Sequence, residues 1–484
     1  MKPGEIIDYR ITAEVVGEYD VIVCGAGASG CSAAIAAARS GARTLLLEAS
    51  AFIGGMLTEG NAGLTNFVRH GADPDLQTLI NARLRNERGT AQIIGGIALE
   101  FAQRLIDGGS ALGTCGTAGT YVYTDKEKFK ILLFEMMREA GVDVLLRAPV
   151  CDTFVSNGRI EAVVIQTKLG RKAYTAERFI DATGDGDVAA LSGVPFVLGV
   201  GEEDSVYLQG KMKLGDQQEI GAMFRIGGVD FDKYIAYIRN HPEKYSPTRA
   251  GQMTLDEFIL AYERGDMINS IGIMESQRFQ IYNYPQKGIM VGCLSLPGAR
   301  QQQNKNGLDV CDVSAAEFEV LQKAADQVEK LRREVPGFEN AFVLDTPSAG
   351  IRETRHIVGE YRLNIVDILN RVEFPDSIAL GSHPIDVAPV PEEVENWTKP
   401  DEWFFSIPYR CMVPKNIDNL LVSGRCASTT REAFGCIRPT AQCIAMGEAA
   451  GIAAAMLVGT GTAAKDVDIK ALQTRLREVG AVIE

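Results

Sequence analysis

The sequence has little positive charge and few histidines. Its 49 lysine and arginine residues are outnumbered by 63 aspartate and glutamate residues, and four histidines occur, so the formal net charge is −14. A surface of this sign repels nucleic-acid phosphates and anionic lipid head groups. We therefore expect neither a nucleic acid nor a membrane among the partners of this chain.

The sequence also lacks the cysteine patterns of metal sites and redox pairs. Ten cysteines are scattered along the chain, with no CxxC pair and no cluster of cysteine and histidine at metal-ligand spacing. Unpaired cysteine is most often a small buried residue, and such thiols persist in reducing compartments. We expect no metal site, and a cytoplasmic protein whose cysteines are packed inside.

Long uninterrupted apolar runs are missing as well. The opening segment MKPGEIIDYRITAEVVGEYD carries acidic residues throughout and has no apolar core of a signal peptide. The longest helix-like apolar stretch, TAQCIAMGEAAGIAAAMLV, is rich in alanine and glycine and is interrupted by Glu448. It is typical of a buried helix rather than of a membrane span.

What is present indicates an α/β protein. The chain has 484 residues, 46% of them hydrophobic and 23% charged, which is an ordinary globular composition with room for two or three cores. Residues 21–23 predict a buried strand, residues 31–41 an alanine-rich helix and residues 42–48 a second strand. This order is that of a parallel βαβ unit.

The rest of the chain alternates between regular and irregular parts. Residues 151–184 predict a small antiparallel meander, with turns at Asn157-Gly158 and Leu169-Gly170. The least regular part contains several prolines and one long charged helix. We expect a discontinuous dinucleotide-binding domain of residues 1–72, 121–225 and 341–484, with an inserted α+β substrate or cap region of residues 73–120 and 226–340.

The hexapeptide GAGASG, residues 25–30, directly follows the first strand. Gly25 permits a tight turn, Gly27 lets the backbone approach a pyrophosphate, and Gly30 lets the helix lie close to the strand. The helix that Ala28 and Ser29 open offers unpaired N–H groups to phosphates. A glycine-rich turn without a ligand is the alternative, because this motif alone is a weak signal.

An acidic residue, Glu48, follows the motif at a sequence spacing that is informative about a ligand. Glu48 ends the second strand 18 residues after Gly30, close to the ~20 at which a carboxylate meets an adenosine ribose. A carboxylate there repels a 2′-phosphate, so NADP is disfavoured.

A second glycine pair follows Glu48 and Ala49. Gly54 and Gly55, beside Met56, allow backbone to run along a pyrophosphate and ribityl chain, which favours FAD over NAD. The alternative for this pair is a surface turn.

Five blocks, taken together, resemble the FAD-dependent oxidoreductases of the glutathione-reductase and fumarate-reductase-like superfamily. The blocks are DVIVCGAGASGCSAAIAAARSGARTLLLE, GGMLTEGNAG, RFIDATGDGDVAALSG, SAGIRETRHIVGEYRL and NLLVSGRCASTTREAFGCIRPTAQCIAMGEAAGIAAA. They occur in family order between residues 20 and 455. The resemblance implies a Rossmann-like FAD-binding domain and an enzyme.

The resemblance also assigns roles around the cofactor. It places Ala182, Gly184 and Asp185 near the pyrophosphate and ribityl chain, and it brings the backbone of Val150 to the adenine. The remaining residues that it directs to the flavin or its phosphates are Gly424, Arg425, Arg438 and Ala441, the last in a helix that points its amino terminus at the ring.

Three features that the superfamily uses elsewhere are missing. The block GGMLTEGNAG has no histidine for covalent attachment, so we expect non-covalent FAD. There is no second GxGxxG motif for an NADPH domain, and no cysteine pair for disulfide reduction.

Four side chains are candidates for substrate chemistry. Arg352, Arg355 and His356 lie together in IRETRHIVGEYRL, and His383 lies in the loop GSHPIDV. Arginine is a fixed cation that binds a carboxylate or stabilises reduced flavin, and histidine carries protons near neutral pH. The alternative for the arginines is a structural Arg–Glu ion pair between two domains.

These observations favour a soluble FAD-dependent oxidoreductase of the dehydrogenase or reductase type, which transfers a hydride between flavin N5 and a small polar or carboxylated organic substrate. Two alternatives stay open. One is a flavin-dependent monooxygenase, and the other is a flavin-carrying subunit or sensor that passes electrons to a redox partner. A homo-oligomer is compatible with each of them.

Overall fold

The computed structural model describes residues 12–69, 92–116, 119–204, 212–245, 254–264, 280–296, 305–387 and 403–484. The charged stretch LQTLINARLRNERG, residues 76–89, for which the sequence predicts a helix, lies outside these ranges.

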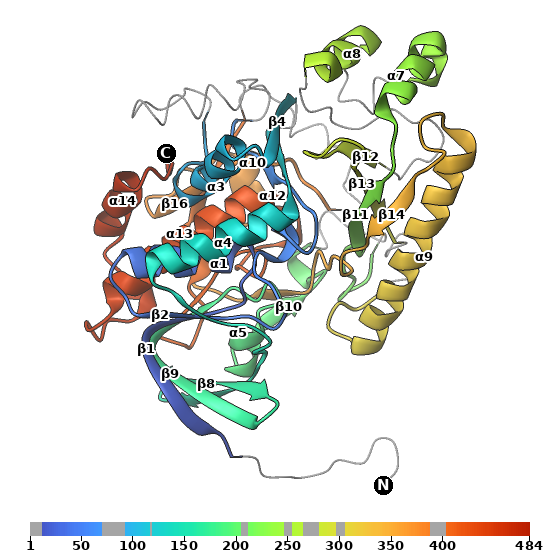
Figure 1. The fold of residues 1–484 in the computed structure, drawn as a ribbon. Coiled ribbons are helices and arrows are strands. Elements are labelled where there is room, and N and C mark those ends of the chain that lie inside the picture. Colours follow the sequence, from blue (N-terminus) through green and yellow to red (C-terminus); the bar gives the residue numbers. More distant parts are fainter. Residues whose placement is uncertain are drawn as a thin grey trace.

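A sheet built mainly from parallel strands organises the larger lobe (Figure 1). The strand β1 (Glu14–Cys24) pairs in parallel with β2 (Thr44–Leu47) and with β9 (Gly170–Asp181). Beyond them, β6 (Asp143–Leu145) pairs with β2, and β18 (Leu420–Val422) pairs with the end of β9. The parallel βαβ unit expected at the start of the chain is confirmed.

Both faces of this sheet are buried, because successive side chains of a strand point to opposite sides. Val21 and Val23 belong to the core on one face, whereas Ile22 and Cys24 belong to the core on the other face. A continuous apolar run such as VIVC is therefore the pattern of a strand covered on both sides.

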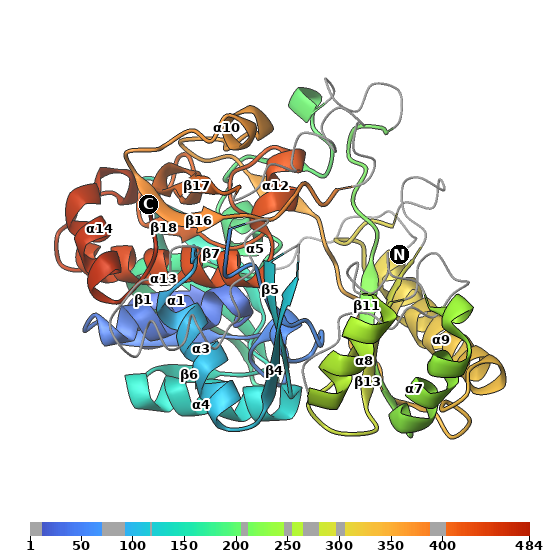
Figure 2. The same cartoon turned by 90° about the horizontal axis from the view of Figure 1, so that it is seen from above.

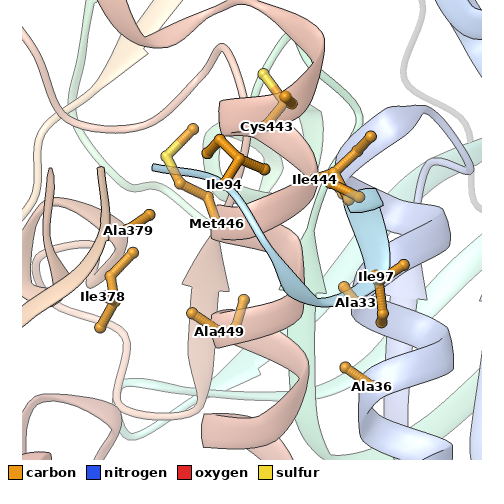
Figure 3. Close-up of a cluster of buried hydrophobic side chains, with 14 of the residues drawn as sticks. Ala33, Ala36, Ile94, Ile97, Ile378, Ala379, Cys443, Ile444, Met446 and Ala449 are labelled. Carbon is orange, nitrogen blue, oxygen red and sulfur yellow. The ribbon is translucent and has the colours of Figure 1, made fainter. Parts of the chain in front are cut away.

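Helices cover the face of the sheet to which Val21 and Val23 point. They are α1 (Ala28–Arg39), α3 (Gly96–Asp107), α4 (Lys126–Ala140) and α13 (Thr440–Leu457). Figure 3 shows Ala33 of α1, Ile97 of α3 and Ala449 of α13 around one shared core. Small residues let α1 and α13 approach closely: a Cβ at Gly447 would lie 2.1 Å from the carbonyl oxygen of Ser29.

The antiparallel meander is confirmed. It consists of β7 (Val150–Ser156), β8 (Arg159–Thr167) and the first half of β9. Asn157 and Gly158 both have positive φ, 49° and 72°, which is the backbone of the two-residue hairpin turn that an Asn-Gly pair favours. The first half of β9 therefore pairs with β8 on one side and with β1 on the other, so β9 belongs to both the meander and the parallel sheet.

The smaller lobe has its own sheet and its own core (Figure 2). The antiparallel sheet has the order β12 (Gln280–Asn283), β13 (Met290–Ser295), β11 (Gly221–Gly227) and β14 (Phe342–Asp345). The helices of this lobe are α7 (Phe231–Asn240), α8 (Leu255–Arg264) and α9 (Val310–Glu334). This is the α+β insertion expected from the sequence.

The boundaries of the insertion differ from the expected ones. Its sheet begins at Gly221 and ends at Asp345, so the lobe extends beyond 226–340 on both sides. The expected assignment of residues 73–120 to the cap does not hold for α3, because Ile97, Leu99 and Phe101 are packed in the main core. Apolar residues at helical spacing show that a helix is amphipathic, but they do not identify the core that it faces.

Ionic contacts hold the smaller lobe against α4. Asp345 accepts a hydrogen bond from Arg225 Nε at 2.9 Å and forms an ion pair with Lys126. The hydroxyl of Tyr284 accepts a 3.0 Å hydrogen bond from the backbone N–H of Lys126. The position of the cap relative to the larger lobe is therefore fixed near the start of α4.

Short elements complete the fold. One three-stranded sheet contains β3 (Leu64–Thr65), β5 (Gly119–Thr124) and β4 (Ala111–Gly116). Two pairs are β10 (Phe196–Leu198) with β15 (Arg355–Ile357), and β16 (Ser377–Gly381) with β17 (Phe405–Pro408). The remaining α-helices in the described ranges are α5 (Asp187–Leu191), α10 (Ile365–Leu369), α12 (Arg431–Ile437) and α14 (Ile469–Glu478).

Among the described helices, α13 is the one long and apolar enough to cross a membrane by length and composition. However, 78% of that helix is buried inside the protein. The helix therefore packs as the sequence predicts, as a core element.

Candidate active site

A cavity of about 390 Å³ lies where the carboxyl ends of β1, β2, β9 and β18 meet the amino termini of α1 and α13. We call it the first cavity. Open parallel sheets bind their ligands at this edge, in the crevice beyond the carboxyl ends of the strands.

The loop after β1 gives the first cavity a wall of bare backbone. Gly25 has φ of +91°, a conformation that favours glycine, and a Cβ at this residue would lie 2.6 Å from the carbonyl oxygen of Ala182. A Cβ at Gly27 would meet nothing within 4 Å, so this residue leaves open space. A Cβ at Gly30 would lie 1.7 Å from the carbonyl oxygen of Gly25, so this residue allows close packing of α1 under the loop.

The amino terminus of α1 faces the same space. No side chain caps the helix at Gly27, and the first N–H groups of a helix lack partners within the helix. Together with the partial positive charge of the helix terminus, such groups suit an anion, above all a phosphate.

Glu48 lies at the end of β2 and organises two turns of the first cavity. Its Oε2 accepts a 2.7 Å hydrogen bond from the N–H of Ala26, and its Oε1 accepts one of 2.7 Å from the N–H of Ser50. The carboxylate therefore holds the glycine loop as well as lining the cavity.

A second glycine turn packs against the first one. Gly54 has φ of +107° and Gly55 has φ of +51° at the start of η1 (Gly55–Leu57). A Cβ at Gly55 would lie 3.0 Å from the Cα of Gly27. The two glycine segments thus form a narrow groove of backbone.

The segment after β9 carries a buried carboxylate and an ion pair. Burial raises the pKa of Asp181 to about 6, against hydrogen bonds from Ala189 and Thr183 that lower it. Arg425 donates to Asp185 Oδ1 at 2.7 Å and to the hydroxyl of Thr354 at 3.3 Å. This pair joins the loop after β9 to the loop after β18.

The loop after β18 contacts α1, although the two segments lie far apart in the sequence. The hydroxyls of Ser29 and Ser423 are 2.6 Å apart, although 394 positions separate them in the sequence. Gly424 has φ of +88°, and a Cβ there would lie 3.2 Å from the Cβ of Ser29. The distant blocks of the sequence therefore meet at one place.

A second cavity of about 310 Å³ adjoins the first one. The two cavities share part of their walls, namely Met56, Gly350, Ile351, Arg425, Arg438 and Thr440. The second cavity lies between the lobes, because Gly221, Met223 and Cys293 come from the cap sheet, whereas Tyr123 comes from β5.

Charged groups are concentrated on one part of the second cavity, where Arg352, His383, Asp386 and Arg438 line it. Arg438 forms an ion pair with Asp386 and also donates to its carbonyl oxygen at 3.1 Å. His383 Nε2 lies 3.9 Å from Asp386 Oδ2. Burial works to raise the pKa of Asp386, but the charges of Arg438, His383 and Arg352 outweigh it and lower the pKa.

Small and apolar residues also line the second cavity. Ala62, Ala222 and Met223 contribute to it, and Tyr123 is 4% exposed. Burial raises the pKa of the Cys293 thiol, although the charge of Arg352 works against this effect. The second cavity therefore suits a small molecule with an acidic end and a short apolar body.

The residues of the first cavity fit a flavin dinucleotide. The uncapped start of α1 and the open space at Gly27 suit the pyrophosphate, and Glu48 suits a ribose. The sequence model of the FAD dependent oxidoreductase family matches residues 20–476. The chain belongs to this family.

The family gives the protein its cofactor, FAD, and its class, an oxidoreductase. Curated relatives match over shorter stretches. The tRNA uridine 5-carboxymethylaminomethyl modification enzyme MnmG of Heliobacterium modesticaldum is 60% identical over 40 residues, 8% of this chain and 6% of that protein. The enzyme of the same name from Caldicellulosiruptor saccharolyticus is 27% identical over 179 residues, 35% of this chain and 25% of that protein. The chain thus matches a quarter or less of each relative.

Solved structures of flavoproteins are similar over nearly the whole chain. A geranylgeranyl bacteriochlorophyll reductase-like protein from Thermoplasma acidophilum has a TM-score of 0.46 and 14% identity, over 96% of this chain and 84% of that chain. A flavin-dependent brominase, Bmp2, has a TM-score of 0.43 and 12% identity, over 95% and 83%. The p-nitrophenol 4-monooxygenase PnpA from Pseudomonas putida has a TM-score of 0.42 and 11% identity, over 96% and 81%. These scores are too low to bear on the substrate.

Most of the predicted cofactor residues of this FAD-dependent oxidoreductase line the first cavity. They are Gly25, Gly27, Ala28, Ser29, Glu48, Gly55, Met56, Ala182, Gly184, Gly424, Arg425 and Arg438. The others do not form its wall. They are Gly30, Ala49, Gly54, Val150, Asp185 and Ala441.

The four candidates for substrate chemistry separate into two pairs. Arg352 and His383 line the second cavity. Arg355 and His356 line neither cavity. Arg355 donates to Asp187 at 2.8 Å and to the carbonyl oxygen of Asp185 at 2.9 Å, within the larger lobe.

Several residues of the site do not stand out in the sequence. Asp386 follows His383 by three residues, and this spacing was the available signal. Ser423 and Cys443 lie in a block that resembles the family, but their types alone carry no signal for a cofactor. Tyr123 and Cys293 could not be found, because they reach the second cavity only through the packing of two lobes.

Proposed function

We propose that this FAD-dependent oxidoreductase is of the dehydrogenase or reductase type and transfers a hydride between flavin N5 and a small polar or carboxylated organic substrate. The carrying observation is the second cavity, which shares a wall with the first and gathers Arg352, His383 and Arg438. When bound, FAD supplies a two-electron acceptor and donor.

Arg352 binds the carboxylate of the substrate in this proposal. Arg352 lines the second cavity and not the first, so in this proposal its guanidinium contacts the substrate and not FAD. Arg352 also forms an ion pair with Glu219, whose Oε2 lies 3.9 Å from Arg352 Nη1. Guanidinium and carboxylate match in planar geometry, which fixes the orientation of the substrate as well as its affinity.

His383 moves the proton that accompanies the hydride. Histidine changes charge near neutral pH, and His383 faces the second cavity. The carboxylate of Asp386 lies near its Nε2 and carries negative charge, because its pKa is lowered. Arg438 in turn keeps Asp386 in place, and its own position next to both cavities links the substrate side to the cofactor side.

We further propose that FAD is bound without a covalent link. The turn at residues 54–63, which packs against the glycine loop, contains no histidine. Acid precipitation of the purified protein should therefore leave the yellow colour in the supernatant. A yellow pellet would contradict this.

A cytoplasmic location is also a proposal. The described part of the chain holds its cysteines as free thiols, most of them buried, which suits a reducing compartment. In line with the negative net charge, we propose a small molecule as the partner, and neither a nucleic acid nor a membrane.

An anaerobic assay tests the proposed function. The FAD-loaded protein is mixed with small hydroxy acids and amino acids, and the dithionite-reduced protein with unsaturated acids, while the flavin absorbance is followed. We expect at least one acid to react and its amide to react far more slowly. Equal rates for acids and amides would overturn the carboxylate part of the proposal.

Variants at the second cavity provide the matched comparison. R352A and H383N should keep FAD and lose most of the turnover, whereas R410A should keep both. Arg410 is a suitable control because it forms an ion pair with Asp376 and lines neither cavity. Full activity in both R352A and H383N would remove these residues from the proposed site.

A further inference from the structure

Gly221 begins β11 and lines the second cavity directly beside Arg352. A Cβ at this residue would lie 2.7 Å from Arg352 Nη2 and 3.2 Å from its Cζ. The first of these distances is one that real Cβ contacts essentially never show. The guanidinium therefore occupies the space that any other side chain at residue 221 would need.

The backbone conformation of residue 221 does not require glycine. Its φ lies outside the positive range that disfavours other residues, so its backbone is one that alanine adopts. Glycine at residue 221 therefore leaves room for a neighbouring group and is not needed for a special backbone conformation. The space is used by the terminus of a flexible side chain, which can move away without disturbing the backbone.

The backbone around this contact is fixed. The N–H of Gly221 donates to the carbonyl oxygen of Gly350 at 3.1 Å, and the N–H of Gly350 donates back at 2.7 Å. This bridge holds the start of β11 next to the segment that carries Arg352, two residues further on. Because these hydrogen bonds fix the backbone at Gly221 and at Gly350, the position of the Arg352 guanidinium depends on the space next to Gly221.

We propose that Gly221 is a positioning residue, which sets where the guanidinium of Arg352 lies in the second cavity and so determines the affinity for carboxylate substrates. This inference rests on the proposed function, because it assigns Arg352 to the carboxylate. It adds a specificity-determining position in the cap lobe, at a residue that has no side chain of its own.

The test is G221A in the full-length, FAD-loaded protein. Acetate, lactate, succinate and fumarate, with their amides, are titrated against the visible spectrum of the bound flavin. For the carboxylate that binds best to the wild type, we expect G221A to raise the Kd about 10- to 100-fold, as for loss of a charge-assisted hydrogen bond. The affinity for the amides and the FAD content should stay unchanged.

Two comparisons separate positioning from a structural effect. G108A is the control, because Gly108 has φ of −78° and a Cβ there would lie 3.3 Å from a backbone oxygen, away from both cavities. In the R352A background, G221A should cause no further loss, since the group that it displaces is gone. An equal loss with and without Arg352 would overturn the proposal.

A crystal structure of G221A distinguishes the two ways to fail. A displaced guanidinium with unchanged carboxylate affinity would support the role of Gly221 in placing Arg352 but overturn the proposed function of Arg352. An unmoved guanidinium would overturn the role of Gly221. If no carboxylate binds the wild type, the proposed function fails. The position of the Arg352 guanidinium in the G221A crystal structure still tests whether Gly221 places it.

Discussion

His356 Nε2 lies 3.1 Å from Glu353 Oε1, and both side chains are almost completely buried. The second oxygen of Glu353 accepts a 3.1 Å hydrogen bond from Arg431, which is buried as well. Burial works to raise the pKa of Glu353, but Arg431 and His356 together outweigh it and lower the pKa. This cluster joins β15 to α12 and gives His356 a packing role.

Removing one charge of this cluster should cost stability. We expect E353Q to lower the free energy of unfolding by about 3 kcal/mol or more, because the buried Arg431 loses its compensating charge. Thermal unfolding of FAD-loaded protein measures the change. The exposed Glu360 provides the control E360Q, and an unfolding temperature equal in both variants would contradict the prediction.

Loss of the Glu48 carboxylate should weaken FAD binding. We expect E48A to raise the Kd for FAD about 10- to 100-fold, since the bonded N–H groups of Ala26 and Ser50 lose a charged acceptor and the ribose loses its partner. Fluorescence titration of the apoprotein with FAD measures it. E18A on the exposed part of β1 should bind FAD like the wild type, and the prediction fails if E48A does so too.

Alanine at Gly447 should force α1 and α13 apart. Its Cβ would lie 2.1 Å from the carbonyl oxygen of Ser29 and 2.2 Å from the hydroxyl of Ser32, and the backbone atom cannot turn aside. Overpacking of this kind costs about 1–3 kcal/mol or more. Because Ser29 opens α1 at the first cavity, G447A should lose both thermal stability and FAD content, whereas A445S on the same helix should keep them.

The stability of the protein should depend on pH through Glu432. Burial, with the charge of Asp204, raises the pKa of Glu432 from an ordinary value of 4.5 to about 7. A raised pKa favours the protonated group in the folded state, so this contribution is fully present below pH 4.5 and is lost as the pH rises through about 7.

The variant E432Q isolates this effect. Each pKa unit corresponds to about 1.4 kcal/mol, so E432Q should be more stable than the wild type at alkaline pH by up to roughly 3 kcal/mol. Urea unfolding of both proteins across the pH range gives the difference, in which other groups cancel. A difference that does not grow as the pH rises through neutrality would contradict the raised pKa.

Local sequence signals were sufficient for the parts of the fold that depend on neighbours in the chain. GAGASG between an apolar run and an alanine-rich helix predicted β1 and α1, and Asn157-Gly158 predicted the turn of the meander. In each case the backbone requirement and the residue that meets it lie within a few positions.

The second cavity could be predicted only in part. IRETRH is rich in charge, but Arg352 precedes the strand β15 whereas His356 lies within it, and the sequence alone does not say which of the two faces a substrate. Arg352 lines the cavity, whereas His356 pairs with Val197 in the strand β10 and is buried. The ion pair of Asp386 with Arg438 spans 52 positions, a separation that only the folded chain closes.

The contact of Ser29 with Ser423 has a consequence for biosynthesis. A chain still attached to the ribosome can form β1, the glycine loop and α1 early, yet the loop that closes over them follows almost four hundred residues later. The wall of the first cavity is therefore complete only after the loop that follows β18 has been made. Before α13 has been made, the apolar flank of α1 that it covers lacks this partner.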